Sequence, residues 1–439
     1  MNDDTSTIPR AESASIPDFV HPATLDLCAV LPATMWLHAD AARYLVSTII
    51  HKQACREVDE AGDAHLKAKY LRNVMGDQYA RIMKSLTSGR DPVLHMSGYS
   101  PGAYSRGFRL DERFMDDELR YCRPVNPIIR DRLATVYAQS AEEQRRRWLP
   151  IDYTLRQMQR RLRVTSDAEA IIGGLKLGAR LGQRMLAENI RRGWPNYKVS
   201  PYGRRFNGLT GIKREIRSSC LRLDGAPLAN VDLRCAQPAL LALFMEIVQR
   251  ARKTPAIGLK GATSYKDHLL PPLILFATDL HGLNLPRPDS AFRRLVCEGD
   301  LYCELASYSG LDRDECKVPF MKHVLAKNGL YHSQFEDDFR HRFPSVHRFV
   351  RLMNRRDHAN LIRILQRLEA WLVVETVALR LVDRIPIVTL HDAIYCRQGD
   401  ETTVEAAFRQ VFSELDFAIG LKLDPGQSVA VVSVSRIAA

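Results

Sequence analysis

Residues 230–242 read NVDLRCAQPALLA, and the interpretation of the whole chain depends on this stretch. An apolar, strand-like run ends at Asp232, and after Gln237-Pro238 an apolar helix follows. A carboxylate in such surroundings is costly unless hydrogen bonds or a cation match its charge. One interpretation is a helix cap, because an acid at a strand–helix junction can accept from free backbone amides. The other is a functional acid, and the rest of the chain bears on the choice.

Length and composition indicate a globular protein with a polyanionic partner. The chain has 439 residues, which predicts two or three domains, and a formal net charge of +12. Its nine cysteines are scattered, with no CxxC pair, which argues for a reducing compartment and against a disulfide framework or structural zinc. The sequence shows no apolar run typical of a membrane span and no signal peptide. We therefore expect a cytoplasmic protein without a membrane partner, compatible with a bacterial, phage or mobile-element context.

The patterning along the chain predicts an α+β fold. The polar residues 1–20 are predicted to be a disordered lead, and residues 21–195 to be mainly helical. From residue 196 onward, strand-like pieces at 197–200, 227–233 and 385–396 alternate with helices. The expected helices span 236–252, 289–308, 312–327, 333–354 and 358–382.

Two segments of the N-terminal region combine basic and aromatic residues. Residues 142–163 contain seven arginines, among them Arg145, Arg146 and Arg147, with Trp148 and Tyr153 between them. Such a run forms either a solvated charged face or a surface that grips a phosphate backbone. The Gly-, Ser- and Tyr-rich residues 95–110 predict a surface turn, in which Tyr99, Tyr104, Arg106 and Arg109 offer stacking and phosphate contacts as the alternative.

A second conspicuous acid is Asp392. It follows the apolar run IPIVTL and precedes AIYC, so His391-Asp392 is expected at the turn of a hairpin. A turn aspartate is the simpler interpretation. Alternatively, two strand-end carboxylates, Asp232 and Asp392, could hold two divalent cations about 4 Å apart for a phosphoryl transfer. Mg²⁺ is the natural ion for carboxylates and substrate phosphates, with Mn²⁺ as a substitute.

A basic segment lies between the two acids. In RDECKVPFMKHVLAKNG (313–329), Arg313, Lys317, Met321 and Leu325 recur every four residues, which would place them on one helix face. Two cations followed by two apolar side chains could hold a triphosphate and pack on a base. An ordinary amphipathic helix explains the same spacing, and Pro319 disturbs its hydrogen-bond ladder.

The order of these elements resembles the family A DNA polymerases and their relatives, the single-subunit phage and mitochondrial RNA polymerases. Asp232 is similar to the motif A aspartate, Arg313-Lys317-Met321 to the motif B fingers helix, and His391-Asp392 to motif C. Three further elements are similar to the family's pattern: residues 200–204, ending in Gly203-Arg204; REIRSSCLRLDGAPLANVD (214–232), which contains Arg217; and Gln366 in ILQRLEAW. The likeness covers about residues 196 to 400.

The resemblance implies a right-hand polymerase with a small antiparallel palm sheet, helical fingers and a mainly helical N-terminal and thumb-like region at 21–195. The palm would comprise 196–288 and 358–439, with the fingers at 289–357. It implies a template-directed nucleotidyltransferase that extends a 3′-hydroxyl with nucleoside triphosphates by a two-metal mechanism, with DNA synthesis slightly favoured. Template and primer or product strands would be its partners.

The implied site residues fall into three groups. Asp232 and Asp392 would bind two Mg²⁺ ions, and Lys317 and Arg313 would act on the triphosphate in catalysis. The residues near the nucleotide would be Gln237, Met321, Leu325 and His391. The residues that contact nucleic acid would be Gly203, Arg204, Arg217, Gln366, Arg145, Arg146 and Arg147.

Several departures from the family pattern keep alternatives open. The fingers-helix tyrosine is replaced by Leu325, and the glutamate five residues after the motif A aspartate by Gln237. The HDA ending at 391–393 is closer to the RNA polymerases. The alternatives are an RNA polymerase or primase, a catalytically inactive polymerase-like module that binds nucleic acid, and an unrelated basic helical binding protein.

Overall fold

A computed structural model describes residues 16–55, 57–98, 105–194, 196–253, 285–326, 331 and 333–425, except for the side chains of 251–253. The chain forms two compact units. Unit 1 comprises Met1–Trp148, Val164–Pro195 and Gly208–Cys220, and unit 2 comprises Leu149–Arg163, Asn196–Asn207 and Leu221–Ala439. Among the described residues, no helix combines the length and the apolar character needed to cross a membrane.

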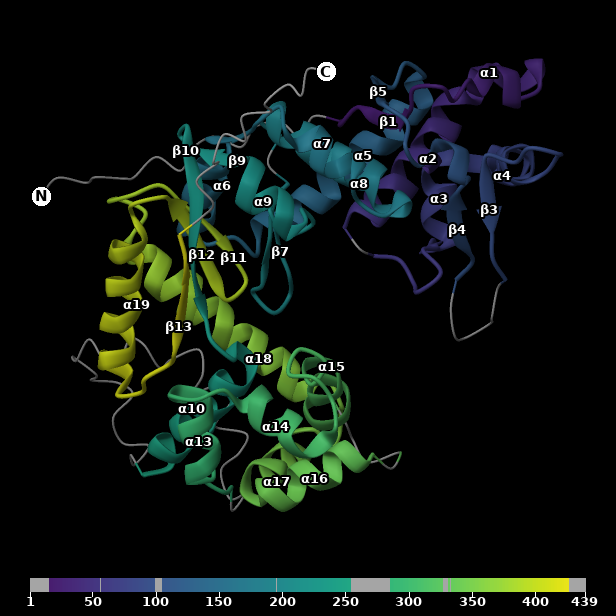
Figure 1. Ribbon diagram of the computed structural model, residues 1–439. Coiled ribbons are helices and arrows are strands. Elements are labelled where there is room, and N and C mark those ends of the chain that lie inside the picture. Colours follow the sequence, from purple (N-terminus) through teal and green to yellow (C-terminus); the bar gives the residue numbers. More distant parts are fainter. Residues whose placement is uncertain are drawn as a thin grey trace, which may run out of the picture. The chain divides into compact units, whose positions relative to one another are not determined.

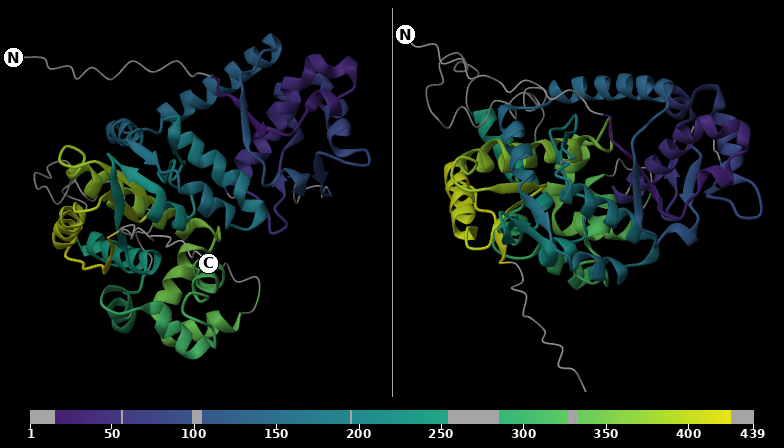
Figure 2. Two further views of the ribbon diagram at one scale, coloured as in Figure 1. Left: turned by 45° about the horizontal axis from the view of Figure 1, so that its top comes forward. Right: turned by 90° about the horizontal axis from the view of Figure 1, so that it is seen from above.

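Unit 1 is mainly helical, as the sequence predicts. Its helices are α1 (Leu27–Val30), α2 (Ala39–Ala54), α3 (Ala68–Met75), α4 (Tyr79–Thr87), α5 (Pro127–Arg145), α7 (Ala168–Gly173), α8 (Leu177–Arg191) and α9 (Arg214–Cys220), with 3₁₀ turns at Ala33–His38, Gly76–Gln78 and Glu112–Phe114. Two small antiparallel sheets join them: β1 (Phe19–Pro22) with β5 (Leu119–Cys122), and β2 (Ala64–His65), β4 (Gly107–Leu110) and β3 (Leu94–Met96) in the order β2-β4-β3. The long helix α5 is prominent in both views of Figure 2.

The centre of unit 1 is the packing of α2 against α8. Gly182 of α8 approaches α2 so closely that a Cβ there would lie 2.9 Å from the Cα of Ala54. Apolar residues of α2 such as Leu45 and Ile49 are fully buried. The predicted disordered lead at 1–20 extends too far toward the C-terminus. Strand β1 already begins at Phe19, a buried residue that pairs with Cys122. Tyr99 and Tyr104 lie outside the described residues.

Unit 2 is organised around a six-stranded antiparallel sheet (Figure 1). Its strands are β6 (Leu162–Val164), β9 (Leu221–Leu223), β10 (Ala226–Leu233), β11 (Ile387–Leu390), β12 (Ala393–Arg397) and β13 (Leu421–Asp424). The order is β11-β12-β10-β9-β6, and β13 also pairs with β10. A separate hairpin is formed by β7 (Lys198–Val199) and β8 (Arg205–Phe206). These small antiparallel sheets among many helices confirm the prediction of an α+β fold.

Except for the helix at Ala236–Lys253, which matches its expected range 236–252, the helices of unit 2 are shorter than the sequence pattern predicts. They are α6 (Pro150–Gln159), α10 (Ala236–Lys253), α13 (Ser290–Cys297), α14 (Leu301–Ser309), α15 (Lys317–Pro319), α16 (Gln334–Arg342), α17 (Pro344–Met353), α18 (Asn360–Ala370) and α19 (Glu401–Leu415), with π-helical segments at Phe320–Leu325 and Trp371–Val377 and a 3₁₀ turn at Ala378–Arg380. Asp300 caps α14 and so divides the expected helix 289–308. Pro344 begins α17 and divides 333–354, because proline cannot continue the preceding helix. Helix α19 lies beside the sheet in Figures 1 and 2.

Helix α6 belongs to unit 2, whereas the sequence pattern placed residues 150–163 in the N-terminal region. The physical reason is a buried polar network that no sequence periodicity reveals. Asp152 of α6 is 0% exposed and accepts from Arg205 Nε at 2.9 Å and from the Tyr197 hydroxyl at 2.6 Å. Arg205 also donates to Glu375 at 3.1 Å. A buried charge requires such partners, so α6 is held to the β7–β8 hairpin and to the helical segment after α18.

Candidate active site

Strands β10 and β12 bring Asp232 and Asp392 together. Asp232 pairs directly with Ala393, and the amide of Leu233 donates to the carbonyl oxygen of Asp392 at 3.2 Å. Asp392 is the second residue of a two-residue hairpin loop, because Leu390 pairs with Ala393 across the turn. Two acids that are 160 positions apart in the sequence thereby become neighbours at the ends of two adjacent strands of the sheet.

Burial and the neighbouring charge make Asp232 harder to ionise, and burial does the same for Asp392. Burial and then the charge of Asp392 raise the pKa of Asp232, and Lys422, which pairs with Asp232 on β13, opposes the shift. Burial also raises the pKa of Asp392, against the lowering effects of Arg204 and Lys317. Two adjacent carboxylates cannot both ionise cheaply in such a site, so a bound cation would stabilise their ionised form.

Glu369 is a third acid of the site and was not identified from the sequence. It lies on α18, is 2% exposed, and accepts from Gln237 Nε2 at 2.9 Å. Burial, with the charge of Asp392 as a smaller cause, raises the pKa of Glu369 to about 7. The sequence did contain a signal for this acid. In ILQRLEAW, Glu369 stands among apolar residues, three positions after Gln366 and therefore on the same helix face.

Arg204 links this acid to the hairpin loop. Its Nε donates to His391 Nδ1 at 2.9 Å and lies 3.3 Å from the Glu369 carboxylate. The preceding Gly203 has a φ of +76°, and a Cβ there would lie 2.9 Å from an Arg367 nitrogen of α18. Glycine therefore permits both the turn and the close approach that bring Arg204 to Glu369.

Two residues beside the acids adopt a left-handed backbone. His391 has a φ of +56° and Cys235 a φ of +47°. The first central residue of a two-residue hairpin loop requires positive φ, which costs a non-glycine residue about 1 kcal/mol or more. Strain of this kind is maintained where a particular side chain is needed, and the His391 ring packs edge-on against Phe206 at 5.8 Å.

Arg313 and Lys317 stand on the segment before the buried π-helical turn. Arg313 donates to Asp300 at 2.7 Å and 2.9 Å, and Asp300 in turn accepts weakly from Cys235 Sγ at 3.6 Å. Lys317 lies 5.9 Å from the centre of the Tyr302 ring and lowers the pKa of Asp392. Lys317 therefore lies within electrostatic reach of Asp392, whereas the contacts of Arg313 are with Asp300 and Asp314.

The two apolar residues of the predicted helix face, Met321 and Leu325, differ in their exposure to solvent. Met321 is half-buried, whereas Leu325 is fully buried and its carbonyl accepts from Asn354 at 2.6 Å. The reason is that residues 320–325 form a π-helical segment, so the four-residue spacing no longer keeps one face. Leu325 is therefore a core residue with no surface for a nucleotide, contrary to its predicted position. Gln366 is half-buried on α18, one turn before Glu369.

Four of the predicted nucleic-acid contacts lie in unit 1 and have local partners. Arg145 and Arg146 pair with Glu142, and Arg147 pairs with Glu143, on the exposed end of α5 and the turn after it. Arg217 of α9 donates to the backbone carbonyls of Leu209 and Ile212. The bonds of Arg217 stabilise a turn of the backbone. The ion pairs of Arg145, Arg146 and Arg147 agree with the first of the two interpretations of this run, a solvated charged face.

The oxygens of the two aspartates suit a divalent cation. Oδ1 of Asp232 is buried and has no hydrogen-bond partner among the described residues, so it is available to a cation. No group of three or more His, Cys, Asp or Glu residues in the described ranges is arranged to hold a metal. Two carboxylates that require further oxygens from substrate or water suit Mg²⁺, which keeps several such ligands.

No family model matches the chain, and no curated protein matches it. One matching solved structure is described as the POL domain of Pol1 from M. smegmatis in complex with DNA primer-template and dNTP. The match has 14% sequence identity and a TM-score of 0.23, and it covers 59% of this chain and 55% of that chain. At this TM-score the likeness establishes neither the fold nor the function of the present chain.

Proposed function

We propose that unit 2 is a template-directed nucleotidyltransferase that adds nucleotides to the 3′-hydroxyl of a nucleic-acid strand. The observation that supports it is the pair Asp232–Asp392. The two carboxylates meet at strand ends, one oxygen of the pair lacks a hydrogen-bond partner among the described residues, and basic side chains surround them. In this proposal the sheet of unit 2 is the palm and the helices from Ser290 to Met353 are the fingers of a right hand.

Each residue of the site has a distinct role in the proposed reaction. The 3′-hydroxyl oxygen forms a bond to the α-phosphorus and pyrophosphate leaves. Asp232 and Asp392 would hold the divalent ions, which when bound supply positive charge to the reacting oxygens. Lys317 and Arg313 would neutralise the triphosphate and the leaving pyrophosphate. Arg204 orients His391 beside the reacting centre through its 2.9 Å hydrogen bond.

Gln237 is the proposed selector of the sugar. Gln237 stands five positions after Asp232 in the sequence. Its side-chain amide is fixed by the hydrogen bond to Glu369. A fixed side chain of this size beside C2′ would exclude a 2′-hydroxyl and favour DNA synthesis.

One observation favours the RNA polymerase or primase alternative. Like Oδ1 of Asp232, Oε1 of Gln237 is a buried acceptor without a hydrogen-bond partner among the described residues. A ribose 2′-hydroxyl could donate to this oxygen, and a buried acceptor gains from such a bond. The two alternatives therefore differ in whether Gln237 repels or binds the 2′-hydroxyl.

A primer-extension assay tests the proposal. The full chain is incubated with Mg²⁺ or Mn²⁺ and a primed template, with dNTPs, with rNTPs, and without template or primer. Extension that requires the template and is lost in Asp392→Asn supports the proposal. An inactive protein that still binds primed template would identify a nucleic-acid-binding module instead. Extension by the Asp392→Asn variant at the wild-type rate would contradict the assignment of the acids.

A further inference from the structure

Helix α8 of unit 1 ends in a turn that presents an exposed indole. Gly193 has a φ of +66°, and its amide donates to the carbonyl of Ile190 at 3.0 Å. The amide of the next residue, Trp194, reaches back to the carbonyl of Asn189 at 2.9 Å. Two such hydrogen bonds around a left-handed glycine are a common way to end a helix. They fix the backbone of Trp194, a residue that remains 42% exposed.

An arginine and a tyrosine lie beside this indole. The guanidinium carbon of Arg192 is 3.7 Å from the centre of the Tyr121 ring and 5.1 Å from that of the Trp194 ring. The rings of Tyr121, on β5, and Trp194 meet edge-on, with their centres 6.3 Å apart. A guanidinium so close to aromatic rings is attracted to their π-electrons. The three side chains therefore form one cluster, which we call the Trp194 platform.

Two carboxylates hold the arginine of the Trp194 platform in place. The Nε of Arg192 donates to Glu188 at 2.8 Å, and its Nη1 lies 3.7 Å from the carboxylate of Asp18. An arginine that becomes ordered only on binding loses considerable rotamer freedom. Because Arg192 is already ordered, a flat ligand would bind beside it with little further loss of side-chain entropy.

The most exposed charge next to the Trp194 platform is positive. Arg123 lies 3.9 Å from Asp18, the same acid that Arg192 approaches, and its side chain is 91% exposed. The acids are less exposed, at 18% for Asp18 and 30% for Glu188, and Glu188 also pairs with Arg191 at 3.5 Å. An exposed ion pair as long as that of Arg123 contributes little. A phosphate could therefore replace Asp18 as the partner of Arg123.

An unpaired nucleotide matches both features of this surface. Its base offers a flat face to the indole, and the neighbouring phosphate offers a negative charge to the guanidinium. A base in a duplex is covered by its neighbours, whereas a base in a single strand can turn its face to an aromatic side chain. An acidic peptide or a lipid headgroup supplies the charge without the flat ring.

We propose that the Trp194 platform binds single-stranded nucleic acid, with the indole of Trp194 stacked on an unpaired base and Arg123 in contact with an adjacent phosphate. The site is separate from the arginines at 145–147, which pair with glutamates at the end of α5. Such binding requires neither a divalent ion nor nucleotide addition. It is therefore independent of the reaction proposed for unit 2 and can be measured without it.

A comparison of two strands separates base stacking from other effects. A labelled oligothymidine of about 12 nucleotides and an abasic strand of the same length are titrated with the full chain in EDTA, and fluorescence anisotropy gives both affinities. Trp194→Ala should weaken the binding of oligothymidine at least about fivefold, because a base loses its stacking partner. The affinity for the abasic strand should change less than about twofold. Equal losses for the two strands overturn the proposal.

Two further substitutions control for folding and for residue type. Trp194→Phe keeps a flat ring and should retain most of the oligothymidine affinity that Trp194→Ala loses. Trp36→Ala removes another indole of unit 1, which is 53% exposed and donates to the carbonyls of Cys28 and Leu31. This control should leave both affinities unchanged. A Trp194→Phe variant that binds as weakly as Trp194→Ala contradicts stacking on the ring.

The salt dependence of binding tests the phosphate contact. Loss of one contact to a single strand reduces the slope of log affinity against log salt concentration by about 0.7. Arg123→Gln should show this smaller slope and keep the difference between oligothymidine and the abasic strand. Arg90→Gln removes the same charge from another exposed arginine of unit 1 and should keep the wild-type slope. An unchanged slope in Arg123→Gln contradicts the contact.

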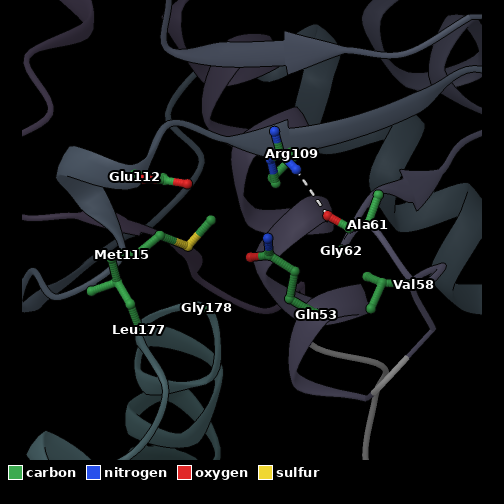
Figure 3. A pocket seen from close by; sticks show the side chains of 9 residues that line it. All are labelled: Gln53, Val58, Ala61, Gly62, Arg109, Glu112, Met115, Leu177 and Gly178. Carbon is green, nitrogen blue, oxygen red and sulfur yellow. Dashed lines mark hydrogen bonds between the residues drawn. The ribbon is translucent and has the colours of Figure 1, made fainter.

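A cavity of unit 1 is another place where a base could bind (Figure 3). It has a volume of about 270 Å³ and is lined by Leu177 and Gly178 at the start of α8, whereas Trp194 follows the end of that helix. None of the described residues that line the cavity is aromatic, so its wall offers no ring for stacking. Leu177→Ala should leave both affinities unchanged. A loss of oligothymidine affinity as large as that in Trp194→Ala would contradict the assignment to the Trp194 platform.

Oligouridine in the same titration tests the sugar of the bound strand. The strand type that loses affinity in Trp194→Ala is the ligand, and both types lose affinity if the platform contacts only base and phosphate. Loss for neither type, or no binding of either up to about 1 mM, overturns the proposal.

Discussion

Gln237 donates a 2.9 Å hydrogen bond to Glu369, joining the first turn of α10 to a buried acid of α18. The bond fixes the Gln237 side chain, which as a flexible glutamine would otherwise sample many rotamers. Glu369 needs this donor as well, because a buried carboxylate without partners is costly. The two residues therefore position one another.

The first prediction concerns this glutamine as the sugar selector. Gln237→Gly should raise the kcat/KM for a matched rNTP relative to that for the dNTP by about tenfold or more, because the space beside C2′ opens. Gln237→Ala, which keeps the helix propensity of α10, should give a smaller shift in the same direction. A wild-type enzyme that already prefers rNTPs would make the chain an RNA polymerase or primase. An unchanged ratio in both variants would place selection elsewhere in the pocket.

The second prediction concerns the strand-end acids. Asp392→Ala should abolish nucleotide addition, because it removes one of the two carboxylates proposed to bind the ions. Binding of primed template, measured by fluorescence anisotropy, should remain within about twofold of wild type. Asp400→Ala, at an acid between the end of β12 and the start of α19, serves as the control and should keep most of the activity.

The third prediction concerns Lys317. Lys317→Ala should lower kcat/KM for nucleotide addition about a hundredfold, since neutralisation of the triphosphate is worth several kcal/mol in the transition state. Lys322→Ala removes an exposed lysine of the same segment and should have little effect. Near-normal turnover in Lys317→Ala would leave this segment with a structural role alone.

The fourth prediction is a pH dependence of stability without divalent ions. Because the pKa of Asp232 is raised in the folded state, the folded chain binds its proton more tightly than the unfolded chain does. The contribution of Asp232 to the free energy of unfolding is fully present below its unfolded-state pKa of about 4. This contribution is lost as the pH rises toward the pKa of the folded state. Asp232→Asn should therefore be more stable than wild type at pH 8, on the order of 1 kcal/mol, and equal to it near pH 4.

Thermal unfolding between pH 4 and pH 8 measures this difference. Added Mg²⁺ should raise the Tm of wild type at pH 8 more than that of Asp232→Asn, because a cation takes the place of the proton. Asp312→Asn, at an exposed acid, is the control and should show neither effect. A wild type that is as stable as Asp232→Asn across the pH range would contradict the charge repulsion in the pair.

The fifth prediction concerns the buried network of Arg205. Arg205→Met leaves the fully buried Asp152 without its cation and should cost about 3–5 kcal/mol of unfolding free energy in denaturant titration. Arg409→Met breaks an exposed ion pair with Glu405 on α19 and should cost less than about 1 kcal/mol. Equal losses in the two variants would show that the network does not hold α6 to unit 2.

The sequence by itself determined the strand-end positions of Asp232 and Asp392, because apolar runs that stop at an acid mark where a strand leaves the core. It also determined the α+β class and the basic segment of Arg313 and Lys317. These features depend on local patterning, which a single chain displays directly.

Only the tertiary structure decided which residues surround those acids. Glu369, Lys422 and Arg204 come from three separate parts of the chain, and their approach depends on strand register and on the close contact at Gly203. The burial of Leu325 likewise depends on a π-helical segment that a regular helical period does not describe. Periodicity reports which face of an element is apolar, whereas contacts between elements distant in sequence are set by packing and by the pairing of buried charges.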